Sequence, residues 1–178
     1  MNFKPVAASK VTLSELMLPS YSNFSGKIHG GYILSLMDKI AFASASKFSG
    51  YYCVTASVNT VNFLSPIEIG ELVTLKASVN FVGKSSMIVG IRVDSENIRT
   101  GTRNHCNSSY FTMVAKDDDG KSIEVPGLIV STKDEMRRFH HGIQQTRLKN
   151  TNYKIESNDD FDPSQMHALF EQYNVQIK

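Results

Sequence analysis

One stretch of helical periodicity followed by segments of strict alternation sets the tightest limit on how this chain can fold. Between residues 32 and 48 the apolar residues Ile33, Met37 and Ile40 recur at helical spacing, which places them on one face of a helix. From Val73 to Phe81 apolar and polar residues alternate, as they do in a strand with one buried face. A single helix can cover only one side of a sheet made from such strands. The pattern therefore predicts an α+β fold.

The expected order of elements is one strand, the long helix and then four more strands. The strands are expected at residues 11–17, 54–63, 73–81, 87–93 and 106–116, with turn signals between them. Short turns between successive strands favour antiparallel neighbours. The sheet face that the helix leaves open must be polar or buried by a second subunit. We therefore expect a homodimer.

The C-terminal part of the chain differs in character and is predicted to be a helical tail. We place the domain at residues 1–130 and the tail at residues 131–178. A helix is expected at residues 132–149, with a weak apolar stripe of Met136, Ile143 and Leu148 that Gly142 interrupts. We interpret it as a solvated or subunit-packing helix rather than a nucleic-acid-binding arm. A short final helix is expected, capped by Asp162 and with Pro163 at its first position.

Composition argues against several classes of partner and site. Lys and Arg number 19 against 17 Asp and Glu, so the net charge of +2 gives no general reason to expect nucleic acid or a membrane as a partner. The N-terminal residues lack a secretory signal, and no stretch approaches the roughly 20 apolar residues of a membrane span. We therefore expect a cytoplasmic protein. Cys53, Cys106 and the histidines show no metal-ligand spacing, so neither a metal site nor a disulfide is expected.

Gly30 and Gly31 stand where a loop meets the long helix. Backbone N–H groups at such a place lack partners within the helix and lie at the positive end of its dipole, so they can stabilise negative charge. The two glycines can also simply let the chain turn into the helix. Asp38 follows about 10 Å further along the axis, at ~1.5 Å per residue, on the flank shared with Leu34 and Ala41. Spacing alone fits an exposed aspartate as well as a functional one, but beside the glycines it allows a base and an oxyanion donor to share one cleft.

A longer motif surrounds these residues. From Asn23 to Asp38 the chain follows the pattern N-x-x-G-x-x-x-G-G-x-x-x-x-x-x-D, with glycines at 26, 30 and 31. Further marks follow in order: Val54-Thr55, Phe63, Pro66, Gly70, Gly83 and Ser85-Ser86. Over residues 11–127 the chain thereby resembles acyl-CoA thioesterases of the hotdog superfamily, above all the bacterial short- and medium-chain enzymes and the vertebrate cytosolic and brain acyl-CoA hydrolases.

The resemblance implies a hotdog fold, in which a curved antiparallel sheet wraps one central helix and two subunits form two active sites at their interface. It implies that Asn23 of one subunit faces Asp38 of the other, and that dimers assemble into trimers of dimers. The implied reaction is hydrolysis of acyl-CoA, so coenzyme A is part of the substrate and product and no further cofactor is expected. Asp38 would act as general base or as nucleophile, with Gly30 and Gly31 as oxyanion donors and Asn23 as a positioning group.

The coenzyme A part of the substrate is assigned to two of the family marks. The turn at Gly83, Lys84, Ser85 and Ser86 matches the family's CoA-binding position, and Thr55 is added from the earlier mark. Arg92 is interpreted as an ordinary charge on the sheet face.

The residues also allow two other interpretations. A hotdog dehydratase or hydratase would need a catalytic histidine paired with an acid in the helix region, whereas His29 precedes the helix and is interpreted as a loop-packing residue. A non-catalytic protein that binds or senses acyl-CoA is the second alternative, although residues 1–10 are too few for a DNA-binding domain.

Overall fold

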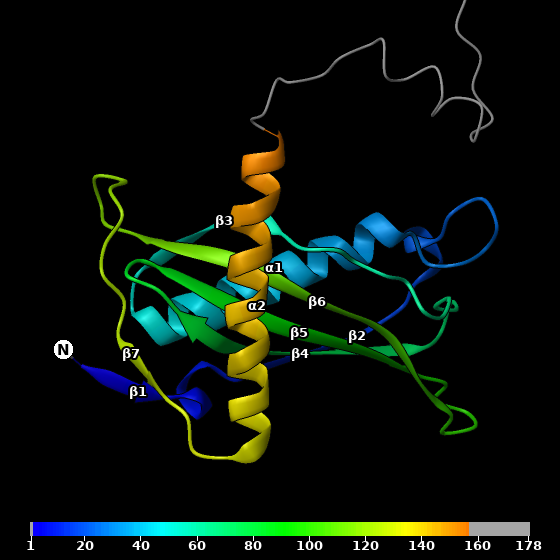
Figure 1. Cartoon of the computed structure of the whole chain (residues 1–178). Coiled ribbons are helices and arrows are strands. Elements are labelled where there is room, and N and C mark those ends of the chain that lie inside the picture. The colour runs from blue at the N-terminus through cyan, green and yellow to red at the C-terminus, as the bar shows by residue number, and fades with distance from the viewer. Residues whose placement is uncertain (1, 157–178) are drawn as a thin grey trace, which may run out of the picture. The chain divides into compact units, whose positions relative to one another are not determined.

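The structure is a computed structural model that describes residues 2–156, with side chains described through Thr146. The elements, shown in Figure 1, are β1 (Phe3–Pro5), η1 (Val6–Ser9), β2 (Val11–Leu16), η2 (Pro19–Tyr21), α1 (Gly30–Ser49), β3 (Tyr52–Val58), β4 (Leu72–Val82), β5 (Ser86–Glu96), β6 (Arg103–Lys116), β7 (Gly127–Ile129) and α2 (Lys133–Glu156). The first compact unit ends at Gln145, so it includes every strand and the first turns of α2.

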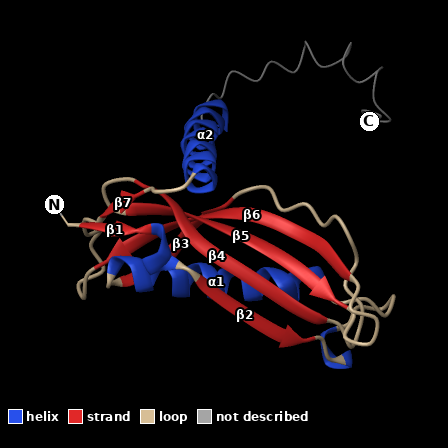
Figure 2. Ribbon diagram, turned by 90° about the horizontal axis from the view of Figure 1, so that it is seen from below, coloured by secondary structure: helices blue, strands red, loops and turns tan. Residues whose placement is uncertain are grey.

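Five strands form one antiparallel sheet in the order β2-β4-β5-β6-β3. Figure 2 shows that the sheet is curved and that α1 lies along its inner face. The predicted α+β architecture, with one helix against a curled antiparallel sheet, is therefore confirmed. α1 ends where the periodicity stops, because Gly50 adopts a left-handed conformation (φ 84°) and its N–H bonds the carbonyl of Ser46.

The partner of β3 differs from the expectation that successive strands are neighbours. β3 pairs with β6, with Val54 opposite Val114, and so forms the edge of the sheet furthest from β2. The strand expected at residues 54–63 was also too long, since β3 ends at Val58. In the sheet order, β6 and β5 lie between β3 and β4. Residues 59–71 therefore cross from the β3 edge to β4, and they do not continue β3.

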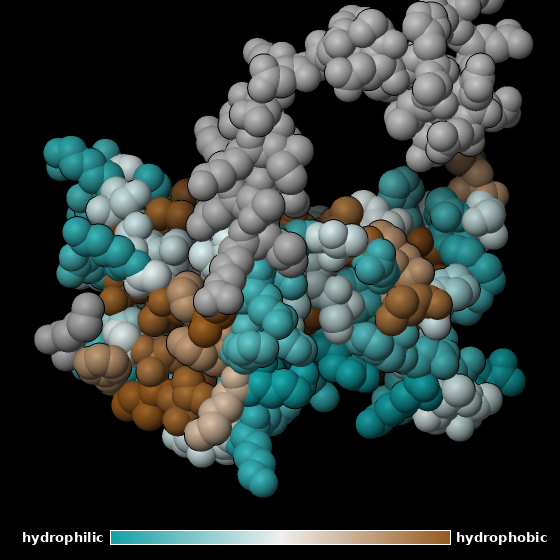
Figure 3. Space-filling model, in the orientation of Figure 1, coloured by the Kyte–Doolittle hydropathy of each residue, from teal (hydrophilic) through white to brown (hydrophobic). Residues whose placement is uncertain are grey.

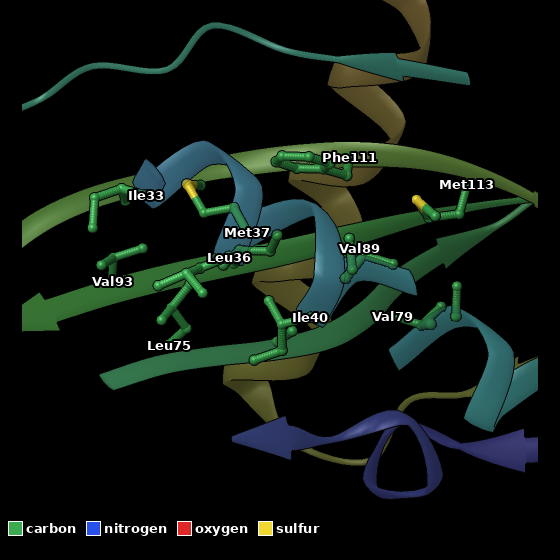
Figure 4. Packing of buried hydrophobic residues seen from close by; sticks show 14 of the residues in the cluster. Ile33, Leu36, Met37, Ile40, Leu75, Val79, Val89, Val93, Phe111 and Met113 are labelled. Carbon is green, nitrogen blue, oxygen red and sulfur yellow. The ribbon is translucent and has the colours of Figure 1, made fainter. Parts of the chain in front are cut away.

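The core lies between α1 and the inner face of the sheet. One stripe of α1 is buried, and Figure 4 shows Ile33, Leu36, Met37 and Ile40 directed at side chains of the central strands, among them Phe111. Each of these side chains is at most 2% exposed. Burying an aliphatic side chain of this size contributes roughly 1.5–3 kcal/mol. This packing fixes the rotation of α1 about its own axis.

The outer face of the sheet is more polar, and the first turns of α2 pack against it. The ring of Phe139 lies 5.5 Å from that of Phe81 on β4, between centroids. A Cβ atom on Gly142 would lie 2.6 Å from the Cβ of Phe81, so this glycine permits close contact rather than interrupting the packing face. The predicted stripe was wrong at Met136, which is 55% exposed. The side chain of Leu148 and the expected final helix lie outside the described residues.

A small parallel pair, β1 with β7, closes the unit beside the main sheet. Phe3 stands opposite Gly127, where any side chain would collide with its ring. Apolar side chains gather over this pair on the surface shown in Figure 3. In the described range, no helix has the length and apolar character needed to cross a bilayer.

Truncating Phe111 tests the packing between α1 and the sheet. Phe111 is 1% exposed, so Phe111→Ala should lower the free energy of unfolding by about 3–5 kcal/mol, measured by urea denaturation. Ile98→Ala is the matched control, because Ile98 is 58% exposed and its truncation should change stability by at most about 0.5 kcal/mol. Equal effects of the two changes would show that the core does not lie where the structure places it.

Candidate active site

The side chain of Asp38 is held by a hydrogen bond from Thr55. The Thr55 hydroxyl donates to Asp38 Oδ1 over 2.6 Å, joining α1 to the edge strand β3 across 17 residues of sequence. Both residues are exposed in the single chain. On α1 Asp38 follows the buried Met37, on a flank where Ala41 is buried and Phe42 is 39% exposed. The carboxylate is therefore held at the margin of the core and open to an approaching ligand.

A β-bulge accompanies this contact. Thr55 is opposite Met113 and Ser57 is opposite Thr112, which leaves Ala56 as the extra residue in β3. Thr55 points to the same sheet face as the buried Cys53, the face that α1 covers. Bulges redirect side chains and end regular pairing. Here the bulge leaves Thr55 as the last residue of the regular run that faces the helix.

The loop before α1 positions Asn23. Asn23 Oδ1 accepts the backbone N–H groups of Ser25 and Lys27 at 3.0 and 3.2 Å, and the hydroxyl of Ser25. These bonds make the asparagine the centre of a tight turn. The side-chain oxygen is thus occupied, while the side-chain nitrogen has no partner among the described residues.

Two tyrosines attach this loop to the body of the protein. Tyr21 stacks on Tyr32 with 3.9 Å between ring centroids, and the Tyr32 hydroxyl donates to Glu15 on β2. Burial and this hydrogen bond raise the pKa of Tyr32 above its usual value. Tyr32 consequently stays a neutral donor, and the loop is fixed at the start of α1.

The start of α1 has one occupied and one free amide. His29 is the N-cap, and its Nδ1 accepts the N–H of Gly31 over 3.0 Å. The N–H of Gly30 has no acceptor within the described part of the chain. The interpretation of His29 as a loop-packing residue therefore overlooked its role as a cap. No sequence signal pointed to it, because Ser, Thr, Asp and Asn are the usual caps.

Asn23 and Gly30 line the same pocket. This hollow, of about 340 Å³, lies beside the start of α1 and is also bounded by Phe63 and Pro66. The Phe63 ring packs closely on Gly30, where a Cβ atom would lie 3.2 Å from it. Asp38 and Thr55 do not line this pocket. One chain thus presents the predicted residues as two groups, Asn23 with Gly30 and Asp38 with Thr55.

The predicted CoA-binding turn joins β4 to β5. Gly83 N–H donates to the carbonyl of Ser86 at 2.8 Å, and a Cβ atom at Gly83 would lie 2.8 Å from the Ser86 hydroxyl, so glycine suits this tight turn. Lys84 is well exposed and pairs with Glu124 at 3.4 Å. Ser85 accepts a bond from the N–H of Ala115 at 3.0 Å. The turn is therefore tied to β6, the strand that also pairs with β3.

Cys53 and Cys106 are free and buried, and burial raises the pKa of the Cys106 thiol. No group of three His, Cys, Asp or Glu side chains within the described residues is arranged to hold a metal ion. Arg92 pairs with Asp94 at 2.9 Å on the outer face, as expected for a charge on the sheet.

The capping role of His29 can be tested by two substitutions. His29→Ala removes the acceptor for the Gly31 N–H and should lower the free energy of unfolding by roughly 0.5–2 kcal/mol. His29→Asn supplies a good capping oxygen and should retain stability. Urea denaturation of both variants measures the difference. An alanine variant as stable as the asparagine variant would rule out the cap.

Three comparisons place the chain among known proteins. The family model described as the thioesterase superfamily matches residues 25–102. Protein VdlD of Helicobacter pylori is 39% identical over 145 residues, which are 82% of this chain and 83% of that protein.

Solved structures share the fold of this chain. A structure titled apo-hexameric acyl-CoA thioesterase is 33% identical with a TM-score of 0.84, and the match covers 86% of this chain and 98% of that one. An acyl-CoA hydrolase from Staphylococcus aureus, solved with butyryl coenzyme A, coenzyme A and coenzyme A disulfide, is 30% identical with a TM-score of 0.80, over 87% and 94% of the chains. Other structures of that enzyme have an aspartate, a threonine or an asparagine replaced by alanine. With a matching family model, a relative of this identity and coverage, and a shared hotdog fold, the chain belongs to the thioesterase superfamily.

Proposed function

We propose that this protein is an acyl-CoA thioesterase that hydrolyses acyl-CoA to a free fatty acid and coenzyme A. The observation that carries the proposal is the Asp38 carboxylate, held by the Thr55 hydroxyl at 2.6 Å and open to solvent two turns from the start of α1. The names of the relatives support the reaction class. The variants solved for the S. aureus enzyme support the residues, because its altered asparagine, aspartate and threonine are spaced along the chain as Asn23, Asp38 and Thr55 are here.

In the proposed mechanism Asp38 acts as general base toward water. The water oxygen attacks the thioester carbonyl while Asp38 takes its proton, and the negative charge that develops on the carbonyl oxygen is stabilised by N–H groups at the start of α1. The tetrahedral intermediate then expels the CoA thiolate, which receives the proton from Asp38. Direct attack by Asp38 to give a mixed anhydride is the alternative, and transfer of ¹⁸O from labelled water into the Asp38 carboxylate would identify it.

The two amides at the start of α1 are not equivalent in this mechanism. Gly30 N–H is free and borders the pocket, so it can donate to the oxyanion without any rearrangement. Gly31 N–H is bonded to the His29 ring, so it can serve only if that ring turns away. The Gly30 amide is therefore the first donor in the proposal, and Gly31 the second.

The site is proposed to be completed by a second subunit. β3 is an edge strand whose outer side has no partner within the described chain, and such edges readily pair with another copy. Exposed apolar side chains lie around it, with Phe42 in edge contact with Tyr52 at 5.5 Å and Val58 46% exposed. Pairing of two β3 edges about a two-fold axis would bring the Asn23 and Gly30 group of one subunit toward Asp38 of the other.

Larger assembly and contacts with coenzyme A belong to the same proposal. Hexamers are named for two of the similar structures, so three such dimers are the expected assembly. Thr55 and the turn of Gly83, Lys84, Ser85 and Ser86 are proposed to contact the CoA part of the substrate. Lys84 supplies a positive charge there for the phosphates, because its partner Glu124 is itself exposed and binds it only weakly.

Replacement of Asp38 tests the reaction and the role of this residue together. Asp38→Asn keeps the shape of the side chain but cannot accept a proton, so turnover should fall by at least about 10²-fold, measured as thiol released from acyl-CoA. Asp118→Asn is the matched control, because Asp118 is an exposed turn residue, and it should keep full activity. Wild-type protein that binds acyl-CoA without releasing thiol would favour the binding or sensing role. An active Asp38→Asn variant would remove Asp38 from the mechanism.

Mixing two inactive variants tests whether the site is shared. Asn23→Ala and Asp38→Ala proteins should each be nearly inactive, and after dissociation and reassembly the mixture should regain about a quarter of wild-type activity. Random pairing makes half of the dimers mixed, and each mixed dimer has one intact site of two. Native mass spectrometry reports both the exchange of subunits and the size of the assembly. No recovery after verified exchange would place the whole site within one chain.

A further inference from the structure

A serine, a histidine and an aspartate form a chain of hydrogen bonds on the outer face of the sheet, opposite the face that α1 covers. The Ser108 hydroxyl lies 3.2 Å from Nε2 of His105, and Nδ1 of His105 lies 3.2 Å from Oδ1 of Asp94. These distances are within the reach expected between a nucleophile, its base and the group that orients the base. The three side chains therefore have the order of contacts that activates a serine hydroxyl.

A bulge in β6 brings the serine and the histidine to the same face. The register between β5 and β6 shifts between Val93 and Asp94, which leaves Cys106 as an extra residue in β6. Cys106 and the residue after it are both buried, so the chain reaches the outer face again at Ser108. In a regular strand, His105 and Ser108 would point to opposite faces, because successive side chains alternate. The bulge is thus what makes their contact possible.

The carboxylate of Asp94 is charged and held in place. It accepts the Nε N–H of Arg92 at 2.9 Å, and Nη2 of Arg92 lies 2.9 Å from Oδ1. Burial acts to raise the pKa of Asp94, but the bonds from Arg92 and His105 outweigh it and lower that pKa. An ionised carboxylate can only accept, so the proton of a neutral His105 ring lies on Nδ1. Nε2 is then left to accept the proton of the Ser108 hydroxyl.

The serine and the histidine are open to a ligand. Ser108 is exposed, and the side chains of His105 and Asp94 are 30% and 23% exposed. Asp94 and His105 line a hollow of about 350 Å³, and Ser108 lines a second hollow that shares Lys76 and Arg92 with the first. The serine hydroxyl thus stands at the border of two hollows of small-molecule size.

Arg92 is placed to stabilise negative charge beside the serine. It stands directly opposite Ser108 in the pairing of β5 with β6, and Lys76 follows in the same row on β4. A guanidinium has five N–H donors, and Asp94 engages only Nε and Nη2, so donors remain for an oxygen next to Ser108. Charged donors held in this way stabilise the oxyanion of a tetrahedral intermediate.

We propose that Ser108, His105 and Asp94 form a second hydrolytic site, which cleaves small carboxylic esters through an acyl-serine intermediate. Ser108 Oγ attacks the ester carbonyl and His105 Nε2 takes the hydroxyl proton, while Asp94 positions the ring. The tetrahedral intermediate expels the alcohol, which leaves with the proton from His105. Water then attacks the acyl-serine and gives one proton to His105, which returns it to Ser108 Oγ as the carboxylic acid departs. The net reaction converts ester and water to acid and alcohol.

This second site is separate from the proposed thioesterase site. Asp38 and Asn23 line neither of the two hollows, and Asp38 belongs to α1 on the inner face of the sheet. The ester hydrolysis therefore goes beyond the proposed function and does not rest on it.

A fluorophosphonate reagent tests the activation of Ser108, because an activated serine oxygen displaces its fluoride and forms a stable phosphonate ester. Mass spectrometry of peptides should find the adduct on Ser108 in the wild-type protein and in Asp38→Asn. His105→Gln should slow labelling by at least about 10²-fold, as expected for loss of a general base. Ser122→Ala is the matched control, because Ser122 is an exposed serine paired with Lys116 at the other end of β6, and it should label at the wild-type rate.

Hydrolysis of p-nitrophenyl acetate measures the activity itself, in Asp38→Asn protein so that the thioesterase site does not contribute. Adding Ser108→Ala should lower the rate by at least about 10²-fold. Adding Asp94→Asn should lower kcat with little change in KM, because Asp94 acts through the ring of His105. Circular dichroism and urea denaturation verify that each variant folds. Absence of an adduct on Ser108, or ester hydrolysis that Ser108→Ala leaves unchanged, would overturn the proposal.

Discussion

The packing of α1 on the inner face of the sheet is the contact on which the other features depend. Because Ile33, Met37 and Ile40 must face the strands, the rotation of the helix is fixed and Asp38 has to lie on its flank. At that flank it meets Thr55, the last residue before the bulge in β3. A carboxylate at the edge of an apolar contact is held in one place while one side stays open to a ligand.

The same contact explains why the candidate active site is divided within one chain. The start of α1 carries Gly30 and faces the loop of Asn23, whereas Asp38 lies two turns further along the helix axis. A rigid helix cannot bring its own N-terminus to its own middle. A second subunit that pairs at the β3 edge can bring the two groups together, and the exposed Phe42 and Tyr52 give that edge an apolar surface to bury.

The two faces of the sheet differ in polarity. On the inner face alternate residues are apolar and pack on α1, whereas the outer face carries Lys76, Arg92 and Tyr110 around Gly90. The first turns of α2 cover only part of that outer face, through Phe139 and Gly142 on Phe81. A pocket lined by cations consequently remains open on the side of the sheet that faces away from Asp38 and Thr55.

The sequence by itself determined the elements whose signal is local. The spacing of Ile33, Met37 and Ile40 gave α1, and the alternation from Val73 to Phe81 gave β4. The motif from Asn23 to Asp38 led to the family and to the residues of the candidate site. These inferences needed only neighbours along the chain.

Only the tertiary structure decided the contacts between distant residues. The pairing of β3 with β6, the bond from Thr55 to Asp38 and the packing of Gly142 on Phe81 each join separate segments, and no local periodicity carries information about such partners. The cap by His29 is a local contact, but histidine is not one of the usual capping residues, so the sequence did not indicate it. Periodicity specifies which face of an element is buried, whereas the partner on that face is selected by the packing of the whole chain.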